Sequence, residues 1–234
     1  MTRQTMLGVW AHPDDEAYLS AGLMAEAAAR GDRVVVVTAT LGEHGTSDPL
    51  LWPPARLRPR RHRELCSSLA RLGVHELRLL GFEDGTCDAR DGAPAIADHI
   101  ADVAPDRIVT FGPDGITGHP DHRAVSQWVT EAWAAVRPSA ELWYATKTVG
   151  FHERFAEVNE RIGIWSEQPS PPRTPEDEAR SVVLPNHLLN VKLAALAAHD
   201  SQTRVLRDLI GPETYREWVR TESFRIVSPA SVTR

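Results

Sequence analysis

Two short segments of the sequence combine histidine and aspartate at spacings that suit metal binding. Residues 12–16 read HPDDE, and residues 119–122 read HPDH. Imidazole nitrogens and carboxylate oxygens are ligands of catalytic zinc, which takes three protein ligands and keeps one position for water. Either segment alone could be a pair of polar helix caps. Together they contain several histidines and carboxylates, and burying so many polar groups costs free energy unless they are paired or bind a metal. The two segments therefore predict a metal site.

The spacing suggests a role for each side chain. His12 and Asp15, on either side of a proline-fixed turn, can reach one point, and His122 can approach it from the second segment. We expect these three to bind one Zn²⁺ per chain, or another divalent metal. Asp14 is then free to act as general base on the metal-bound water, whose pKa the cation lowers to about 7. His119 can face the same point, stabilise the oxyanion and protonate the leaving amine.

The elements around the two segments predict how they meet. Residues 6–11 are a short apolar run, residues 17–30 are rich in helix formers, and residues 34–38 read VVVVT. This order of strand, helix and strand is a βαβ unit of a parallel sheet. Both segments follow predicted strands. Open α/β sheets place their sites at the carboxyl ends of strands, so the segments should meet there.

The alternation continues along the chain. We expect further strands at residues 77–82, 107–111, 141–148 and 224–227, and helices at residues 60–72, 93–103, 120–136 and 188–196. Residues 41–59 read as a polar loop and residues 165–180 as a mobile, proline-rich surface loop. The pattern predicts one α/β domain over residues 1–234, Rossmann-like, with a mostly parallel sheet flanked by helices.

Composition and charge limit the classes of function. The 234 residues are 42% hydrophobic, which is enough for one sizeable core, and the net charge of −6 argues against nucleic-acid and anionic-membrane partners. A basic run at residues 56–63 is either a solvated helix start or an anion contact. The two cysteines lack metal-ligand spacing, and no apolar run suits a signal peptide or a membrane span. We therefore expect a cytoplasmic protein.

The two segments together resemble the paired signature of the PIG-L, or LmbE-like, N-acetylglucosaminyl deacetylase family. The resemblance extends over nearly the whole chain. Weaker matches follow in the family's order, namely a Gly-Glu loop at residues 40–45, an Arg-x-x-Glu helix at 61–65, a loop at 81–85, and Lys192 with residues 199–202. The resemblance implies the same metal ligands and the same roles for Asp14 and His119.

The resemblance also implies substrate contacts and a reaction. Arg61 and Asp84 match positions that contact the sugar in relatives, and Glu43 belongs to the Gly-Glu loop, so all three are candidate substrate-binding residues. Some mycothiol-pathway members carry a tyrosine near the substrate acyl group where this chain has Thr117, so their oxyanion arrangement does not transfer directly. The shorter chain favours the compact branch that includes bacillithiol-pathway deacetylases. We expect the protein to remove an N-acetyl or other N-acyl group from an N-acetylglucosamine-type sugar or glycoconjugate. Relatives often assemble, so a homo-oligomer is also expected.

Three other functions are compatible with an α/β domain of this kind. A dinucleotide-binding protein shares the fold class, but no Gly-x-Gly-x-x-Gly follows the first strand. A binding protein without turnover would not need Asp14 or His119. A zinc amidase acting on a thiol conjugate or a specialised-metabolite amide uses identical machinery and stays open.

Four residues outside the two segments have predictable positions or roles. His199 should support the site by packing and hydrogen bonding rather than as a ligand. Trp52 could stack on a sugar ring or make an apolar contact between subunits. Both cysteines, Cys66 and Cys87, were expected to be buried as small apolar residues.

Overall fold

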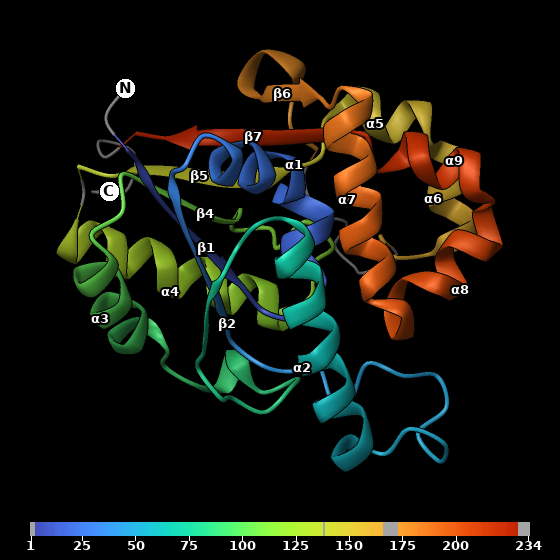
Figure 1. Ribbon diagram of the computed structural model, residues 1–234, viewed down its shortest axis with the longest axis horizontal. Coiled ribbons are helices and arrows are strands. Elements are labelled where there is room, and N and C mark those ends of the chain that lie inside the picture. The colour runs from blue at the N-terminus through green and yellow to red at the C-terminus, as the bar shows by residue number, and fades with distance from the viewer. Residues whose placement is uncertain (1–2, 138, 166–172, 229–234) are drawn as a thin grey trace.

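A seven-stranded sheet runs through the computed structural model, which describes residues 3–137, 139–165 and 173–228. The strand order is β3-β2-β1-β4-β5-β7-β6, with the first five strands parallel and the last two antiparallel at one edge (Figure 1). The predicted α/β fold with a mostly parallel sheet is confirmed. The strands are β1 (Thr5–Trp10), β2 (Arg33–Thr38), β3 (Glu76–Leu79), β4 (Arg107–Phe111), β5 (Glu141–Thr146), β6 (Arg180–Val183) and β7 (Thr221–Val227).

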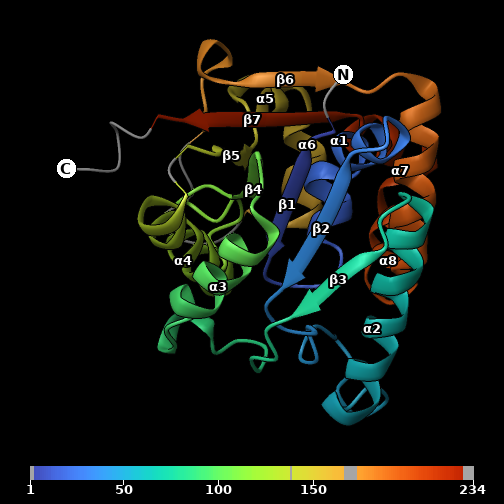
Figure 2. The same ribbon diagram turned by 60° about the vertical axis from the view of Figure 1, so that its left-hand side comes forward.

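Helices cover both faces of the sheet. α1, α2 and α7 pack against one another on one face, and α3 and α4 pack together on the other (Figure 2). The remaining short helices gather beside α7 at one end of the molecule (Figure 1). The helices are α1 (Asp15–Ala29), α2 (Pro54–Arg71), α3 (Ala93–Val103), α4 (Pro120–Val136), α5 (Val149–Arg154), α6 (Ala156–Ile162), α7 (Asn186–Ala198), α8 (Asp200–Ile210) and α9 (Pro212–Trp218).

Burial explains the strand sequences. In β1 and β2 every residue after the first is buried, as expected for central parallel strands that are covered on both faces. β6 is a short edge strand with all four residues exposed, and its shortness limits pairing with other chains.

α1 lies deep between the sheet and α7, so it is built from small residues. At Gly22 of α1 a Cβ would lie 2.3 Å from a methyl carbon of Leu184, so a side chain would not fit there.

Several predicted boundaries were wrong. α2 begins at Pro54, where proline suits the first turn, and continues through Pro59, which had been expected to precede the helix. β3 ends at Leu79 instead of residue 82, and β5 ends at Thr146 instead of residue 148. β6 and the helices α5, α6, α8 and α9 were not predicted. β6, α5, α6 and α9 have four to seven residues, too few to show a clear period, whereas α8 is an amphipathic helix of 11 residues whose pattern was missed.

The expected proline-rich loop at residues 165–180 is described only in part. Residues 166–172 lie outside the described residues. In the remainder, Thr174 forms a β-bridge with Thr148 and the turn η2 (Glu176–Glu178) leads into β6. Within the described ranges, no helix is both long and apolar enough to cross a bilayer.

The two cysteines differ in burial. Cys87 is buried as expected, whereas Cys66 is exposed, so that part of the expectation was wrong. Cys66 lies on the outer face of α2, and its Sγ is 3.7 Å from Nε2 of His62 one turn away.

A buried ion pair ties β7 to α1 and α7. Nζ of Lys192 donates to Oε1 of Glu222 and to the carbonyl oxygen of Tyr18, at 2.8 Å each. The same carboxylate accepts the backbone N–H groups of Gly22 and Leu23, at 2.8 and 3.0 Å. The side chains of both charged residues are at most 1% exposed. This network fixes the position of the first helix, which carries part of the candidate site.

We expect Lys192→Met to lower the free energy of unfolding by about 3–5 kcal/mol, because the Glu222 charge stays buried without its counter-ion. Urea unfolding followed by circular dichroism measures the change. The matched control is Arg154→Met, which breaks the more exposed pair with Glu217 and should cost less than about 1 kcal/mol. Equal effects of the two substitutions would contradict the assigned role of the buried pair.

Candidate metal and catalytic site

The two polar segments meet at the carboxyl ends of β1 and β4. These strands are neighbours in the sheet, although β2 and β3 intervene in the sequence. The order of strands reverses at this point, and open α/β sheets form their clefts at such positions. Residues 12–16 follow β1 and begin α1, while residues 119–122 begin α4. The predicted meeting of the two segments is therefore observed.

The three expected ligands point their donor atoms at one another. Nδ1 of His12 lies 3.1 Å from Nε2 of His122. Different oxygens of Asp15 face the two nitrogens: Oδ2 lies 3.7 Å from Nδ1 of His12, and Oδ1 lies 3.4 Å from Nε2 of His122. Ligands bound to tetrahedral zinc at about 2.0–2.2 Å lie about 3.3–3.6 Å from one another. The three separations lie on both sides of this range, so small side-chain shifts would let the three residues hold one ion of this size.

The outward-facing nitrogens of the two rings support this fit. Nε2 of His12 lies 3.1 Å from carboxylate oxygens of both Asp84 and Asp121, so it carries a hydrogen. Nδ1 of His122 donates to the carbonyl oxygen of Gly115 at 3.0 Å. When each outer nitrogen holds the ring's hydrogen, the lone pairs of the two inner nitrogens face each other and repel. A positive occupant between them removes this repulsion.

Either a proton or a metal ion could be that occupant. Burial opposes a charge on His12, but Asp121, Asp84 and Asp15 outweigh it and raise the pKa of His12 to about 10. The same carboxylates attract a divalent cation. A cation would also bind the Asp15 carboxylate, which a proton between the two rings would not reach. This donor set suits a divalent metal, and His12, Asp15 and His122 stay its predicted ligands.

Asp121 orients His12 from behind and was not assigned this role from the sequence. Its side chain is fully buried and also accepts the backbone N–H groups of Gly85 and Cys87, at 2.8 and 3.0 Å. Two other sets of three donor atoms lie within 4.8 Å of one another, one from His12, His119 and His122 and one from His12, Asp84 and Asp121. Because both of these carboxylates already accept hydrogen bonds, we interpret them as supports of the predicted ligands.

His119 faces the same point without joining the triangle. Its ring nitrogen lies within 4.8 Å of those of His12 and His122. Nδ1 of His119 accepts the backbone N–H of Asp121 at 3.2 Å and so caps α4, which leaves the hydrogen on Nε2. Burial and the charge of His12 lower the pKa of His119. His119 is therefore a neutral N–H donor next to the metal ligands.

Asp14 has an unusual backbone conformation. Its φ of 110° lies in a region that residues other than glycine rarely adopt, at a cost of about 1–3 kcal/mol. The backbone N–H of Asp14 donates to Oε2 of Glu16 at 2.9 Å, which holds the turn. The Asp14 carboxylate lies beside the ligands, 3.5 Å from Arg61, and burial raises its pKa. A strained residue at this position is typical of a functional site.

A buried network beneath Asp14 holds Glu16 in place. Oε1 of Glu16 accepts the hydroxyl of Ser68 at 3.0 Å and lies 2.7 Å from Nε2 of His199. Burial disfavours the carboxylate, but the charge of His199 and its hydrogen bond outweigh burial and lower the pKa of Glu16. The expected supporting role of His199 is confirmed. The partner, Glu16, was not identified from the sequence, because 183 residues separate the two.

Arg61 joins two loops of the site. Its guanidinium donates to the carbonyl oxygens of Gly42 and Pro13, at 2.7 and 2.6 Å. Gly42 has φ of 62°, and a Cβ there would lie 2.0 Å from Nη1 of Arg61, so the contact requires glycine. Arg61 is 4% exposed. Its expected contact with substrate stays a prediction.

The other two expected substrate residues lie near the same loops. Glu43 is buried, and its Oε1 accepts Arg58 at 3.0 Å. Its Oε2 has no hydrogen-bond partner in the part of the chain that the structure describes. Asp84 accepts the backbone N–H of His44 at 2.8 Å; burial opposes its ionisation, but His12 outweighs burial and holds the pKa of Asp84 at about 2. Both substrate roles stay predictions.

Trp52, for which a sugar contact or a subunit contact was considered, is covered by two arginines of α2. The guanidinium carbons of Arg56 and Arg60 lie 4.8 and 4.4 Å from the centre of its ring. These cation–π contacts account for the position of the tryptophan within the chain. The structure favours neither of the two expectations.

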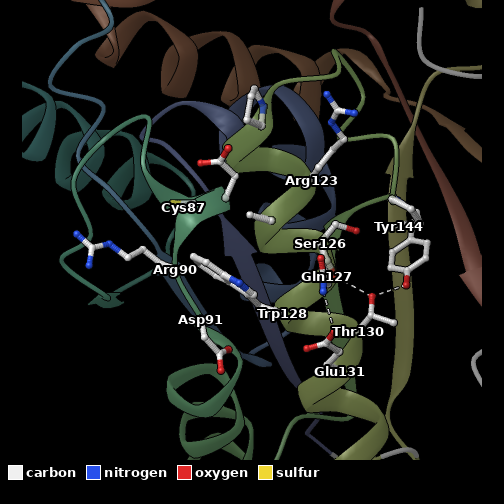
Figure 3. A pocket seen from close by; sticks show the side chains of 14 residues that line it. Cys87, Arg90, Asp91, Arg123, Ser126, Gln127, Trp128, Thr130, Glu131 and Tyr144 are labelled. Atoms are coloured by element: carbon white, nitrogen blue, oxygen red, sulfur yellow. Dashed lines mark hydrogen bonds between the residues drawn. The ribbon is translucent and has the colours of Figure 1, made fainter. Parts of the chain in front are cut away.

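A groove with a volume of about 970 Å³ runs along α4, away from this cluster (Figure 3). Figure 3 shows that polar side chains in it pair with each other. The Thr130 and Tyr144 hydroxyls lie 2.5 Å apart, and Gln127 donates to Glu131 at 2.9 Å. Because none of the expected ligands or catalytic residues lines it, we do not assign the reaction to this groove.

Comparisons with known proteins agree with this site. The PIG-L family model, described as GlcNAc-PI de-N-acetylase, matches residues 7–133, which include both polar segments. A curated relative from Saccharopolyspora erythraea, 1D-myo-inositol 2-acetamido-2-deoxy-alpha-D-glucopyranoside deacetylase 1, is 32% identical over 238 residues. That match covers 86% of this chain and 78% of the relative.

Solved structures share the fold at lower identity. N,N'-diacetylchitobiose deacetylase from Pyrococcus horikoshii superposes with a TM-score of 0.67 and 22% identity, covering 97% of this chain and 85% of that one. The 4-carboxy-2-hydroxymuconate hydratase of Pseudomonas putida has a TM-score of 0.65 and 18% identity, with 96% of each chain covered. These two likenesses show the fold alone. The family match and the curated relative go further, and they show that this chain belongs to the PIG-L family of deacetylases.

Proposed function

We propose that residues 1–234 form a single zinc-dependent hydrolase domain that removes the N-acetyl group, or another N-acyl group, from an N-acetylglucosamine-type sugar or glycoconjugate. The observation that carries this proposal is the triangle of His12, Asp15 and His122, with Asp14 beside it. The curated relative, which is named as a deacetylase of an acetamido sugar, supports the substrate class. The substrate is then a small molecule.

The metal would contribute Lewis acidity. Held by His12, Asp15 and His122, a zinc ion would polarise the amide carbonyl and lower the pKa of water. A site of three ligands suits this function because it keeps one coordination position for a reactant. We propose one such ion per chain.

The surrounding side chains would move the protons. Asp14 takes a proton from the attacking water as the bond from water oxygen to carbonyl carbon forms. Nε2–H of His119 donates a hydrogen bond to the carbonyl oxygen, where negative charge develops. The bond from carbon to nitrogen then breaks as the proton that Asp14 took from water passes to the leaving nitrogen. His119 is neutral and keeps its Nε2 hydrogen on the developing oxyanion, because losing it would leave an imidazolate, so the proton transfer expected from His119 is assigned to Asp14. The products are a free amino sugar and the carboxylate of the acyl group, which is acetate for an acetyl substrate and releases its acid proton to solvent.

Metal content and amine release, measured together, test the proposal. Purified protein is analysed for zinc and incubated with N-acetylglucosamine, diacetylchitobiose, and malate and inositol glycosides of N-acetylglucosamine. We expect about one metal per chain and amine release from at least one sugar. Release only from a thiol-conjugate amide would favour the amidase alternative. Absence of bound metal after reconstitution would contradict the proposal.

A further inference from the structure

A cavity of about 230 Å³ extends from the candidate site. Asp14, Asp15 and His122 lie at one end, while most of the remaining wall is apolar or aromatic and includes Trp165 and Trp218. None of the expected sugar contacts, Arg61, Glu43 or Asp84, lines this cavity. It therefore leads away from the loops where the sugar is expected.

The wall of this cavity carries a cation without a counter-ion. Lys147 directly follows β5, at the same edge of the sheet as the metal ligands. Its Nζ lies 4.7 Å from the centre of the Phe151 ring, and no hydrogen bond or salt bridge joins it to the residues that the structure describes. The nearby Glu222 cannot serve it, because that carboxylate already binds Lys192 and two backbone N–H groups of α1.

An unneutralised cation in such surroundings is costly. Lys147 is half-buried, and charged side chains are rarely withdrawn from water without a partner. Burial and the neighbouring charge of Lys192 lower the pKa of Lys147 to about 7. The other charged residues facing the cavity, Asp14 and Asp15, lie at its metal end. An anion bound near Lys147 would supply the missing partner.

The geometry of an amide indicates which part of the substrate enters the cavity. The two substituents of a trans amide leave it in opposite directions. If the proposed function is right and the sugar lies toward Arg61 and Asp84, the acyl group points into the cavity. A methyl group is about the size of a water molecule, which takes about 30 Å³ in the liquid, so an acetyl methyl would fill little of this space.

We propose that the preferred substrate carries an N-acyl group longer than acetyl that ends in a carboxylate, and that Lys147 binds this carboxylate. The inference rests on the proposed hydrolase function and specifies its acyl specificity. The aromatic wall then packs against the methylene groups of the acyl chain. Lys147 is a specificity-determining residue and takes no part in the proton transfers.

A series of N-acyl glucosamines tests this proposal. Acetyl, butanoyl and pentanoyl derivatives are compared with succinyl, glutaryl and adipoyl derivatives by amine release. We expect the best carboxyacyl substrate to exceed both acetyl and the alkyl chain of equal length in kcat/KM. Lys147→Met should remove this preference and lower kcat/KM for that substrate about 10- to 100-fold, the effect of losing a charged hydrogen bond. Its activity on the acetyl derivative should stay within about twofold.

Two controls separate charge from packing. Arg204→Met removes a positive charge from the exposed side of α8 and should leave the preference unchanged. Leu206→Ala removes part of the apolar wall and so enlarges the cavity. It should lower kcat/KM for long alkyl and long carboxyalkyl substrates by the same factor.

A binding measurement does not depend on turnover. Quenching of tryptophan fluorescence is followed during titration with glutarate or pentanoate, and we expect tighter binding of glutarate to the wild type, lost in Lys147→Met. Turnover of acetyl substrate without any carboxyacyl preference would overturn the inference and leave the proposed function standing. Equal binding of the two acids would also overturn it. If the protein hydrolyses none of the amides but binds glutarate in a Lys147-dependent way, the hydrolase function is refuted and the anion subsite is supported.

Discussion

Asp14→Asn is expected to lower kcat about a thousandfold while zinc content stays near one per chain. The amide keeps the size of the carboxylate but cannot accept the proton of water, and general-base catalysis contributes about 10²- to 10⁴-fold. The Asp14 carboxylate pairs with Arg61 and is not one of the three predicted ligands, so metal binding should persist. Steady-state amine release and metal analysis of the same preparation measure both quantities.

The matched control for this experiment is Asp208→Asn on the exposed side of α8, which should leave kcat unchanged. A kcat of Asp14→Asn within tenfold of the wild type would exclude Asp14 as the general base. Loss of zinc in the same variant would instead make Asp14 a ligand or a support of the ligands.

His122→Ala is expected to lose the metal and, with it, all measurable amine release. The substitution removes one corner of the triangle and leaves two ligands, too few to hold a catalytic zinc ion tightly. Zinc content after dialysis against a weak chelator should fall below about one-tenth of the wild-type value. His187→Ala, at an exposed position, is the control and should retain the metal.

A graded variant strengthens this second test. Asp121→Asn keeps all three ligands but weakens the partner that orients His12. Loss of such an outer partner typically reduces metal affinity 10- to 100-fold, which chelator competition can resolve. If His122→Ala bound zinc as tightly as the wild type, the proposed ligand set would be wrong.

The parts of the fold that could be predicted share a physical property. β2 and β4 are short β-branched or apolar runs, and α3 and α4 begin at or next to a proline, so local sequence defines them. Only residues 224–227 of β7 were predicted, because the charged residue Glu222 occupies a buried position near the start of the strand. Only the tertiary contact with Lys192, 30 positions away, explains that residue.

In the candidate site, too, some residues could be predicted from local sequence and others could not. His12, Asp15 and His122 lie on two compact segments, so spacing and strand order sufficed to predict their meeting. The supporting carboxylates of Glu16 and Asp121 depend on partners from α2, the junction of α7 and α8, and the loop after β3. Such pairs have no pattern in a single sequence, because any surface carboxylate looks the same until the fold is known.

The cavity wall and the catalytic cluster come largely from different parts of the chain. The cluster is complete by residue 122, whereas Lys147, Trp165, Leu206 and Trp218 all lie beyond residue 133, where the family match ends. Substitutions at these cavity positions, unlike substitutions of His199 or Lys192, can therefore alter which amide is accepted without disturbing the ligands. During evolution, gene duplicates would be able to acquire new substrates under relaxed selection on these positions, while purifying selection maintains the catalytic cluster.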